Sequence, residues 1–352
     1  MRILVTGNMG YVGPGVVEQL RRAYPEASLI GLDMGYFAAG LSGPMILPEC
    51  RVDVQHFGDV RRPPADILRD VDAIVHLAAI SNDPMGHRFE KVTLDINHRA
   101  TVELAAQAKA AGVSSFVFAS SCSVYGAADD GARTEDSSVA PLTAYARSKV
   151  LAEQELAGLA GSGFRVTCLR FATACGLSDR LRLDLVLNDF VAAALAEKII
   201  RIQSDGTPWR PLIHVRDMAS AIEWAVGRDG AAGDFVVANV GSDEWNYQVR
   251  DLAGAVAKVI SGVDIWVNPD AQPDRRSYRV SFERFRRLAP RHQPAYDLIA
   301  TVTELAEGLQ RLRFRDTEFR SSAFVRLNVL AALRADGVLD EELRWTPRRD
   351  GG

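Results

Sequence analysis

The sequence predicts an α/β fold, a Rossmann-type doubly wound parallel sheet with a smaller, interleaved C-terminal domain. Apolar runs typical of buried strands alternate with helical patterns through the first half of the chain. Several of these runs are continuously apolar, which indicates burial on both faces of a sheet. The first run leads directly into a glycine-rich turn and a helix. The expected strands span residues 2–6, 29–33, 51–55, 73–77, 115–120 and 165–171.

The helices and later elements follow from the same patterns. Residues 100–111 and 145–159 are rich in Ala, Leu, Glu and Lys, which favour helices. Beyond residue 176 we expect helices at 185–196, 218–226 and 249–259, strands at 199–204 and 234–239, and a loop at 269–279. From residue 302 onward the chain is expected to be helical. Phe324, Leu327, Leu330 and Leu333 form an apolar stripe at helical spacing, which predicts core packing.

Composition excludes several classes of protein. The chain has 352 residues, 47% hydrophobic and 24% charged, which is ordinary for a globular protein. A net charge of −4 argues against a nucleic-acid partner. No apolar run reaches the roughly 20 residues of a membrane-spanning helix, and no signal peptide precedes the first strand. The four cysteines lack metal-ligand or disulfide spacing. We therefore expect a cytoplasmic protein with no metal and no membrane partner.

A glycine-rich turn separates the first strand from the first helix. Gly7, Gly10 and Gly13 would let backbone N–H groups approach a pyrophosphate, whose charge a helix N-terminus favours. On spacing alone, an ordinary strand-to-helix turn explains these glycines equally well. However, the second strand ends at Asp33, whose carboxylate can bind an adenosine ribose, and no arginine follows at 34–37 to pair with a 2′-phosphate. The sequence therefore predicts NAD rather than NADP.

A tyrosine and a lysine share one helical face. Tyr145 and Lys149 are four residues apart. By itself such a pair is more often a surface feature. Ser121 lies immediately after a buried strand, where a reactive hydroxyl would stand at the carboxyl edge of the sheet.

At these positions the chain resembles the extended short-chain dehydrogenase/reductase family, specifically its NAD-dependent nucleotide-sugar epimerases and dehydratases. The matching motifs follow one another in order over most of residues 1–300. They are T-G-x-x-G-x-x-G at 6–13, Gly-Asp-Val at 58–60, His-Leu-Ala-Ala at 76–79, Asn97, Ser-Ser-x-Ser-Val-Tyr-Gly at 120–126, Tyr-x-x-x-Lys at 145–149, the run 206–215 and Asp-Arg-Arg at 274–276.

The resemblance implies specific catalytic and cofactor-binding roles. Tyr145 would remove a proton from a sugar hydroxyl, helped by the cation of Lys149, which would also hold the nicotinamide ribose. Ser121 would steady the developing oxyanion or ketone. The implied cofactor residues are Gly7, Gly10, Tyr11, Val12, Gly13, Asp33, Asp59, Val60, Leu77, Ala78, Ala79, Asn97, Tyr145, Lys149, Phe171 and Ala172. Simpler roles stay open for some: Asn97 can cap a helix, and Val60, Ala78 and Ala79 can be core residues.

The later half is expected to bind the rest of the substrate. By the resemblance, Arg210 and Arg276 grip a diphosphate, with Arg275 as an alternative to Arg276, and Asp274 holds a ribose. Many relatives carry an asparagine where this chain has Thr173. Asn188, or Arg180 and Arg182, could compensate for it. Ser121 and Ser123 complete the expected substrate set.

The reaction depends on positions 122 and 123. Dehydratases of this family carry an Asp-Glu pair where this chain has Cys122 and Ser123, so the sequence favours an epimerase. Cys122 is either a weak acid or a small buried residue. A dehydratase, a net dehydrogenase or reductase, and a non-catalytic NAD-binding protein remain as alternatives.

The expected organisation follows from the motifs. Residues 1–175, joined by 211–243, should form the dinucleotide-binding domain. Residues 176–210 and 244–305 should form the substrate-binding domain, and 306–352 a C-terminal helical extension. By the resemblance, the partner molecules are a nucleotide-diphosphate sugar and a second copy of the chain, which pairs helices 100–111 and 145–159 in a homodimer.

Overall fold

A seven-stranded parallel sheet organises the first half of the chain. The computed structural model describes residues 1–127, 131–271 and 277–346. The strands follow the order β11-β7-β5-β4-β1-β2-β3, so the chain reverses its direction of winding between β1 and β4. Their bounds are β1 Arg2–Thr6, β2 Ser28–Asp33, β3 Val54–Phe57, β4 Ala73–His76, β5 Ser115–Ser121, β7 Arg165–Phe171 and β11 Phe235–Val240. The predicted Rossmann-type architecture is confirmed.

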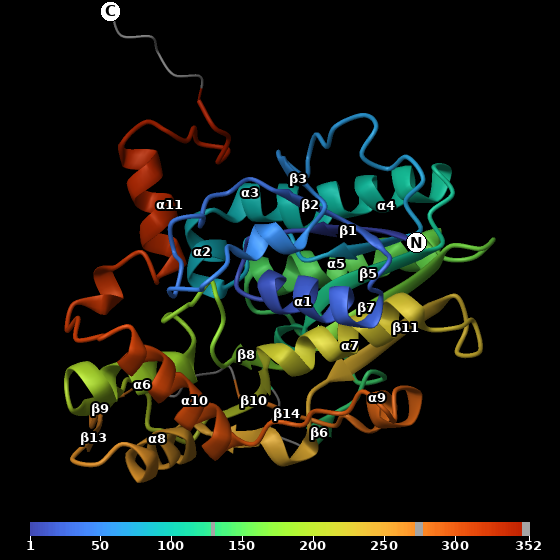
Figure 1. Ribbon diagram of the computed structural model, residues 1–352. Coiled ribbons are helices and arrows are strands. Elements are labelled where there is room, and N and C mark those ends of the chain that lie inside the picture. Colours follow the sequence, from blue (N-terminus) through green and yellow to red (C-terminus); the bar gives the residue numbers. More distant parts are fainter. Residues whose placement is uncertain (128–130, 272–276, 347–352) are drawn as a thin grey trace, which may run out of the picture.

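Helices cover both faces of this sheet, as the continuously apolar strands predicted (Figure 1). On one face α1 (Gly13–Ala23) packs against α7 (Val215–Gly227). On the other face α4 (Ala100–Ala110) packs against α5 (Ala144–Leu159). Successive side chains of β1 point to opposite faces of the sheet. Ile3 and Val5 therefore join the core under α1 and α7, whereas Leu4 joins the core under α4 and α5.

The third strand lies later than predicted. Residues 48–51 form a short 3₁₀ turn, and β3 begins at Val54, where it pairs with Ile30 of β2. This strand lies at the edge of the sheet, and none of its side chains is fully buried. The side chains of an edge strand need not alternate between apolar and polar, so few signals in the sequence mark where β3 begins and ends.

A smaller part builds a separate core from later segments. It contains the three-stranded sheet of β8 (Thr173–Cys175), β10 (Trp209–His214) and β12 (Asn246–Gln248), and the pair β9 (Ile199–Ile202) and β13 (Asp264–Val267). Helices α6 (Val186–Ala196), α8 (Val249–Val259) and α10 (Leu298–Arg311) pack together around it. The remaining short elements are α2 (Asp83–Arg88), α3 (Glu90–Leu94), β6 (Ala132–Arg133), β14 (Arg279–Val280) and α9 (Glu283–Leu288).

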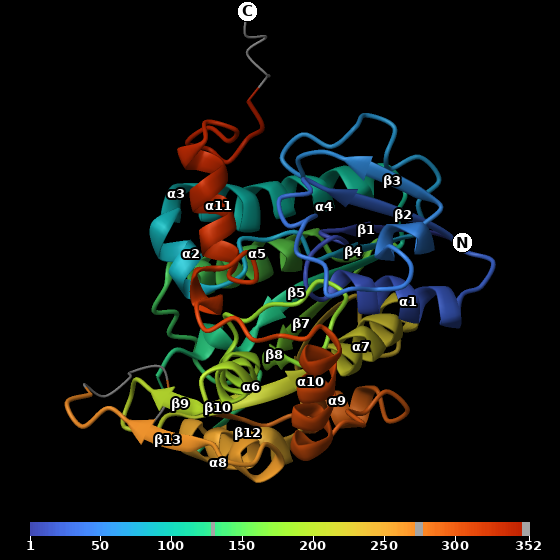
Figure 2. The ribbon, with the colours of Figure 1, turned by 60° about the vertical axis from the view of Figure 1, so that its left-hand side comes forward.

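The C-terminal extension returns to the dinucleotide-binding half. After α10 the chain makes a 3₁₀ turn at Phe319–Ser321 and forms α11 (Arg326–Ala335), which lies beside α2 (Figure 2). The predicted core role of its apolar stripe is confirmed, since Leu330 is fully buried and Leu327 and Leu333 pack against the same core. Residues 312–325 are not helical apart from that turn, which corrects the expectation of a continuously helical extension.

Within the described part of the chain, no helix combines the length and apolar character needed to cross a membrane.

Candidate active site

A cavity of about 830 Å³ runs along the carboxyl ends of β1, β4 and β5, between the large sheet and the smaller part. This is where parallel α/β sheets bind ligands, because the helices on either side diverge at the point where the strand order reverses. The glycine turn and Asp33 line one end of the cavity, whereas Ser121 and Tyr145 line the other.

The glycine turn fits a pyrophosphate. Gly7 has a φ of +74°, and a Cβ there would lie 2.6 Å from the backbone nitrogen of Ala78. A Cβ on Gly13 would lie 2.1 Å from the Asn8 carbonyl oxygen. No side chain caps the first turn of α1, and Gly10, Tyr11 and Val12 face the cavity with Gly7 and Gly13. The turn therefore presents backbone donors and a helix N-terminus to an anion.

Asp33 is fixed at the wall of the cavity. One carboxylate oxygen accepts a hydrogen bond from the Met9 N–H (3.0 Å), and the other from the Gly35 N–H (2.7 Å). Burial raises the pKa of Asp33, and these two hydrogen bonds oppose that shift. The carboxylate is thus positioned for the adenosine ribose, as the sequence predicted for NAD.

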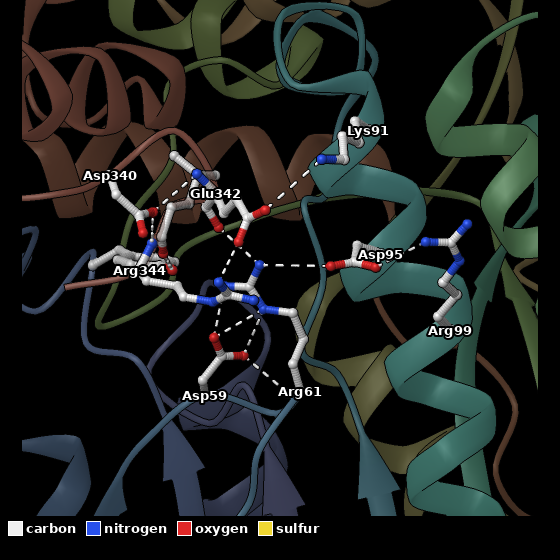
Figure 3. Close-up of polar contacts among 10 residues, drawn as sticks. Asp59, Arg61, Lys91, Asp95, Arg99, Asp340, Glu342 and Arg344 are labelled. Carbon is white, nitrogen blue, oxygen red and sulfur yellow. Dashed lines mark hydrogen bonds and ion pairs between the residues drawn. The ribbon is translucent and has the colours of Figure 1, made fainter. Parts of the chain in front are cut away.

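Asp59 lines the same end but is already paired. Its two carboxylate oxygens accept hydrogen bonds from Nε of Arg61 at 3.0 and 2.9 Å. Arg61 also donates from Nη1 to the main-chain oxygen of Glu342 at 2.8 Å (Figure 3). Sequence reasoning missed Arg61, and no local signal could have found it, because its partner is 281 residues away.

The residues after β4 line the cavity, but Asn97 does not. Leu77, Ala78, Ala79 and Val60 are part of the wall. Asn97 is fully buried, and its side chain exchanges two hydrogen bonds with the main chain of Ile80 (2.8 and 2.9 Å) and donates one to Ser148 (3.2 Å). Asn97, predicted as a cofactor-binding residue, is therefore engaged in internal hydrogen bonds and is not part of the cavity wall.

Ser121, Tyr145 and Lys149 converge as predicted. Ser121 ends β5, and Tyr145 lies in the first turn of α5, which Thr143 caps by accepting a hydrogen bond from the Ala146 N–H (3.1 Å). Burial raises the pKa of Tyr145 to about 12, while hydrogen bonding to Ser121 lowers it. Lys149 Nζ lies 5.7 Å from the Tyr145 ring centroid. Its positive charge favours the phenolate that a base requires.

Lys149 is held by its surroundings. Its Nζ donates to the main-chain oxygen of Ala119 at 2.7 Å and lies 4.6 Å from the Phe118 ring centroid. Burial lowers the pKa of Lys149 to about 8, and the charge of Glu153 opposes this shift. Glu153 in turn pairs with Arg170 at 2.6 Å and accepts a hydrogen bond from Ser120. This buried network ties α5 to β5 and β7 behind the site.

Cys122, a candidate catalytic residue for which two roles were open, is not part of the cavity wall, which favours the small buried residue over the weak acid. It is 1% exposed, and its Sγ donates to the main-chain oxygen of Arg170 at 3.1 Å. Burial raises the pKa of the thiol, so it is a poorer acid than a free cysteine. Ser123 does line the cavity, and its buried hydroxyl has no hydrogen-bond partner among the described residues.

The substrate side is only partly as predicted. Phe171, Ala172, Thr173 and Arg210 line the cavity. Asn188 does not, because its amide is used internally: the oxygen accepts from the Gly176 N–H (3.1 Å), and the nitrogen donates to the Tyr11 hydroxyl (3.0 Å) and the Arg182 carbonyl (2.8 Å). The predicted residues Asp274, Arg275 and Arg276 lie outside the described part of the chain.

Three further residues of the wall come from distant segments. Arg182, one of the residues expected to compensate for Thr173, lines the cavity, and Asp184 accepts a hydrogen bond from its Nε (2.8 Å). Tyr278 and Arg326 also line the cavity, and sequence reasoning missed both. Tyr278 follows the predicted Asp-Arg-Arg motif at 274–276 after one residue, so its position in the sequence could have marked it as a candidate for the cavity wall. Arg326 carries no recognisable signal.

Comparison with known proteins agrees with this geometry. Residues 3–241 match the NAD dependent epimerase/dehydratase family. The UDP-glucose 4-epimerase of Rhizobium meliloti is 28% identical over 86% of this chain and 95% of its own length. The dTDP-glucose 4,6-dehydratase of Streptomyces griseus is 29% identical, over 85% and 92%. The structure of MoeE5 in complex with UDP-glucose and NAD superposes with a TM-score of 0.76 at 25% identity, over 89% of this chain and 100% of that one.

The family match covers the glycine turn, Asp33 and the Ser121–Tyr145–Lys149 group, so the comparisons and the fit of the cavity assign the same cofactor. The chain belongs to the NAD dependent epimerase/dehydratase family, and its cofactor is NAD.

Proposed function

We propose that the chain is an epimerase that acts on a nucleotide-diphosphate sugar through transient oxidation to a keto-sugar. NAD, when bound at the glycine turn and Asp33, would supply the hydride chemistry, so that the sugar carbon is oxidised and then reduced on the other face. The protein must then bind the sugar, move one proton and hold the ketone. Ser121, Tyr145 and Lys149 are placed for these tasks at one end of the cavity.

The role of each residue follows from its surroundings. Tyr145 takes the hydroxyl proton as the carbon is oxidised and returns it after the hydride comes back. Lys149 lies close enough to the Tyr145 ring for its charge to favour the phenolate. Ser121 hydrogen-bonds the reacting oxygen in its neutral and charged forms. Arg210 and Thr173, which also line the cavity, would hold the diphosphate.

The main support for an epimerase is the environment of residues 122 and 123. Elimination of water would require a second acid or base beside the ketone. Cys122 is buried away from the cavity, and Ser123 offers only a hydroxyl. Hydride return after rotation of the keto-sugar needs no such group. This chemistry favours epimerisation over the dehydration named for the relative from Streptomyces griseus.

The test is incubation with UDP-, GDP-, dTDP- and CDP-sugars in D₂O, followed by NMR. We expect a new epimer without solvent deuterium, no product from Tyr145→Phe, and wild-type activity from the control Cys122→Ala. Deuterium next to the oxidised carbon, or a dehydrated product, would contradict the proposed epimerase and indicate a dehydratase. Net accumulation of NADH would indicate a dehydrogenase.

We also propose a homodimer formed through α4 and α5. Leu151 on α5 is 38% exposed, and an interface formed through α5 would cover this side chain. Light scattering should give twice the mass of one chain, and Leu151→Glu should give monomers. A wild-type monomer at micromolar concentration would refute this assembly.

A further inference from the structure

Arg326 reaches the cofactor cavity from the C-terminal extension. It is the first residue of α11, is 1% exposed, and lines the cavity. Its guanidinium carbon lies 4.3 Å from the Phe37 ring centroid, and its Nη2 donates to the main-chain oxygen of Arg180 at 3.1 Å. Its Nη1 is buried and has no hydrogen-bond partner among the described residues. One edge of a buried cation is therefore available to a ligand.

Among the described residues, no carboxylate forms an ion pair with this cation. Neighbouring buried arginines have acidic partners: Arg180 pairs with Glu49 at 2.7 Å, and Arg182 with Asp184 at 2.8 Å. None of the ion pairs found in the described part of the chain includes Arg326. Burial and the charge of Arg182 lower its pKa to about 9. A buried, uncompensated charge is costly, so the site favours an anion.

The neighbours of Arg326 place this anion on the cofactor side. Phe37 and Gly40 belong to the segment that follows Asp33, and a Cβ on Gly40 would lie 3.1 Å from Nη1. Asp33 is near enough to oppose the lowering of the Arg326 pKa. On the other side, Arg182 influences both Arg326 and Tyr145. Arg326 is therefore close to the adenosine-ribose carboxylate on one side, and it shares the neighbour Arg182 with the catalytic tyrosine on the other.

In a dinucleotide that spans these two points, the group between the two riboses is the pyrophosphate. We propose that Arg326 binds the pyrophosphate of NAD through Nη1, so that the C-terminal extension completes the cofactor site. The second diphosphate expected in this cavity, that of the sugar nucleotide, lies toward Arg210.

The test measures binding by calorimetry with Arg326→Met, which keeps the length of the side chain and its packing against Phe37. We expect the dissociation constants of NAD and ADP to rise about tenfold to a hundredfold, because a charge-assisted hydrogen bond is lost. Adenosine and UDP should bind as to the wild type. Arg311→Gln removes an exposed arginine of α10 and is the matched control.

Thermal unfolding supplies a readout that does not depend on activity. Because the variant loses an uncompensated charge, the melting temperature without ligand should stay equal or rise, while the increase caused by NAD should shrink. Unchanged affinity for NAD would overturn the proposal. Weaker binding of UDP alone would assign Arg326 to the sugar nucleotide. Equal losses for adenosine and ADP with a lower melting temperature would reduce Arg326 to a structural role.

Discussion

The two ends of the cavity are built in different ways. At the nicotinamide end, Ser121, Tyr145 and Lys149 come from one strand and the helix that follows it. At the adenosine end, Asp33 ends β2 and Asp59 follows β3, and the tail at 339–345 packs behind them. There Trp345 donates from Nε1 to the Met34 carbonyl at 2.8 Å, and the Tyr36 hydroxyl donates to the Leu343 carbonyl.

We infer from this difference that one end of the cavity determines turnover and that the other determines how tightly NAD is bound. The reacting groups depend on short-range geometry within β5 and α5, which the sequence reveals as a motif. The adenosine end depends on contacts such as that between Arg61 and Glu342, which only the folded chain brings together (Figure 3). Substitutions at the nicotinamide end should therefore alter turnover, and those at the adenosine end should alter stability and NAD affinity.

The largest effect is expected from Tyr145→Phe. Loss of a general base typically lowers the rate by about 10²–10⁴-fold, whereas the ring that packs at the cofactor is kept. The turnover number should fall by that amount, and calorimetry should show NAD affinity within about threefold of the wild type. A variant that keeps a tenth of the turnover would show that another group removes the proton.

Leu343→Ala tests the other end. Leu343 is fully buried in the core beneath α4 and α5, so its truncation should lower the free energy of unfolding by about 2–4 kcal/mol. Urea unfolding measures this change. Val338→Ala, at a 39% exposed position of the same tail, is the control and should cost less than about 1 kcal/mol. Equal effects at both positions would mean that the tail is not docked.

Lys149→Met isolates the pH dependence of the nicotinamide end. Lys149 releases its proton near pH 8 in the folded protein, but only near 10.5 when unfolded. Between these values the unfolded chain binds more protons, so the stability of the wild type should rise with pH relative to the variant. The expected gain is on the order of 2 kcal/mol, measured by urea unfolding from pH 7 to 10.5.

The control for this experiment is Lys258→Met, which removes an exposed lysine of α8 and should leave the slope with pH unchanged. A wild-type slope in Lys149→Met would show that Lys149 keeps its ordinary pKa in the folded protein.

The smallest effect is expected from Asp33→Ser. Loss of the ribose-binding carboxylate should weaken NAD binding by about tenfold, and it should also narrow the preference over NADP, because the carboxylate no longer repels a 2′-phosphate. Calorimetry with both dinucleotides measures the ratio. Asp66→Ser, at an exposed position, is the control. An unchanged ratio would assign the preference for NAD to other residues.

Sequence reasoning found the parts of the site that local geometry imposes. Gly7 and Gly13 are required by close approaches of the backbone, and Tyr145 and Lys149 share a helical face at fixed spacing. It misplaced residues whose role depends on which way a side chain points. Asn97, Cys122 and Asn188 stand beside the cavity, but each directs its polar atoms into internal hydrogen bonds.

The sequence by itself predicted the sheet and the NAD cofactor, and its resemblance to a known family implied the catalytic group, because strand periodicity and motif spacing act over a few residues. Tertiary structure alone decided that Arg61 bonds to the tail at Glu342, and that α11 brings Arg326 to the cavity. The physical reason is that these contacts are selected by the burial of Leu330, Leu339 and Leu343 against the dinucleotide-binding core. Such burial has no preferred separation along the chain.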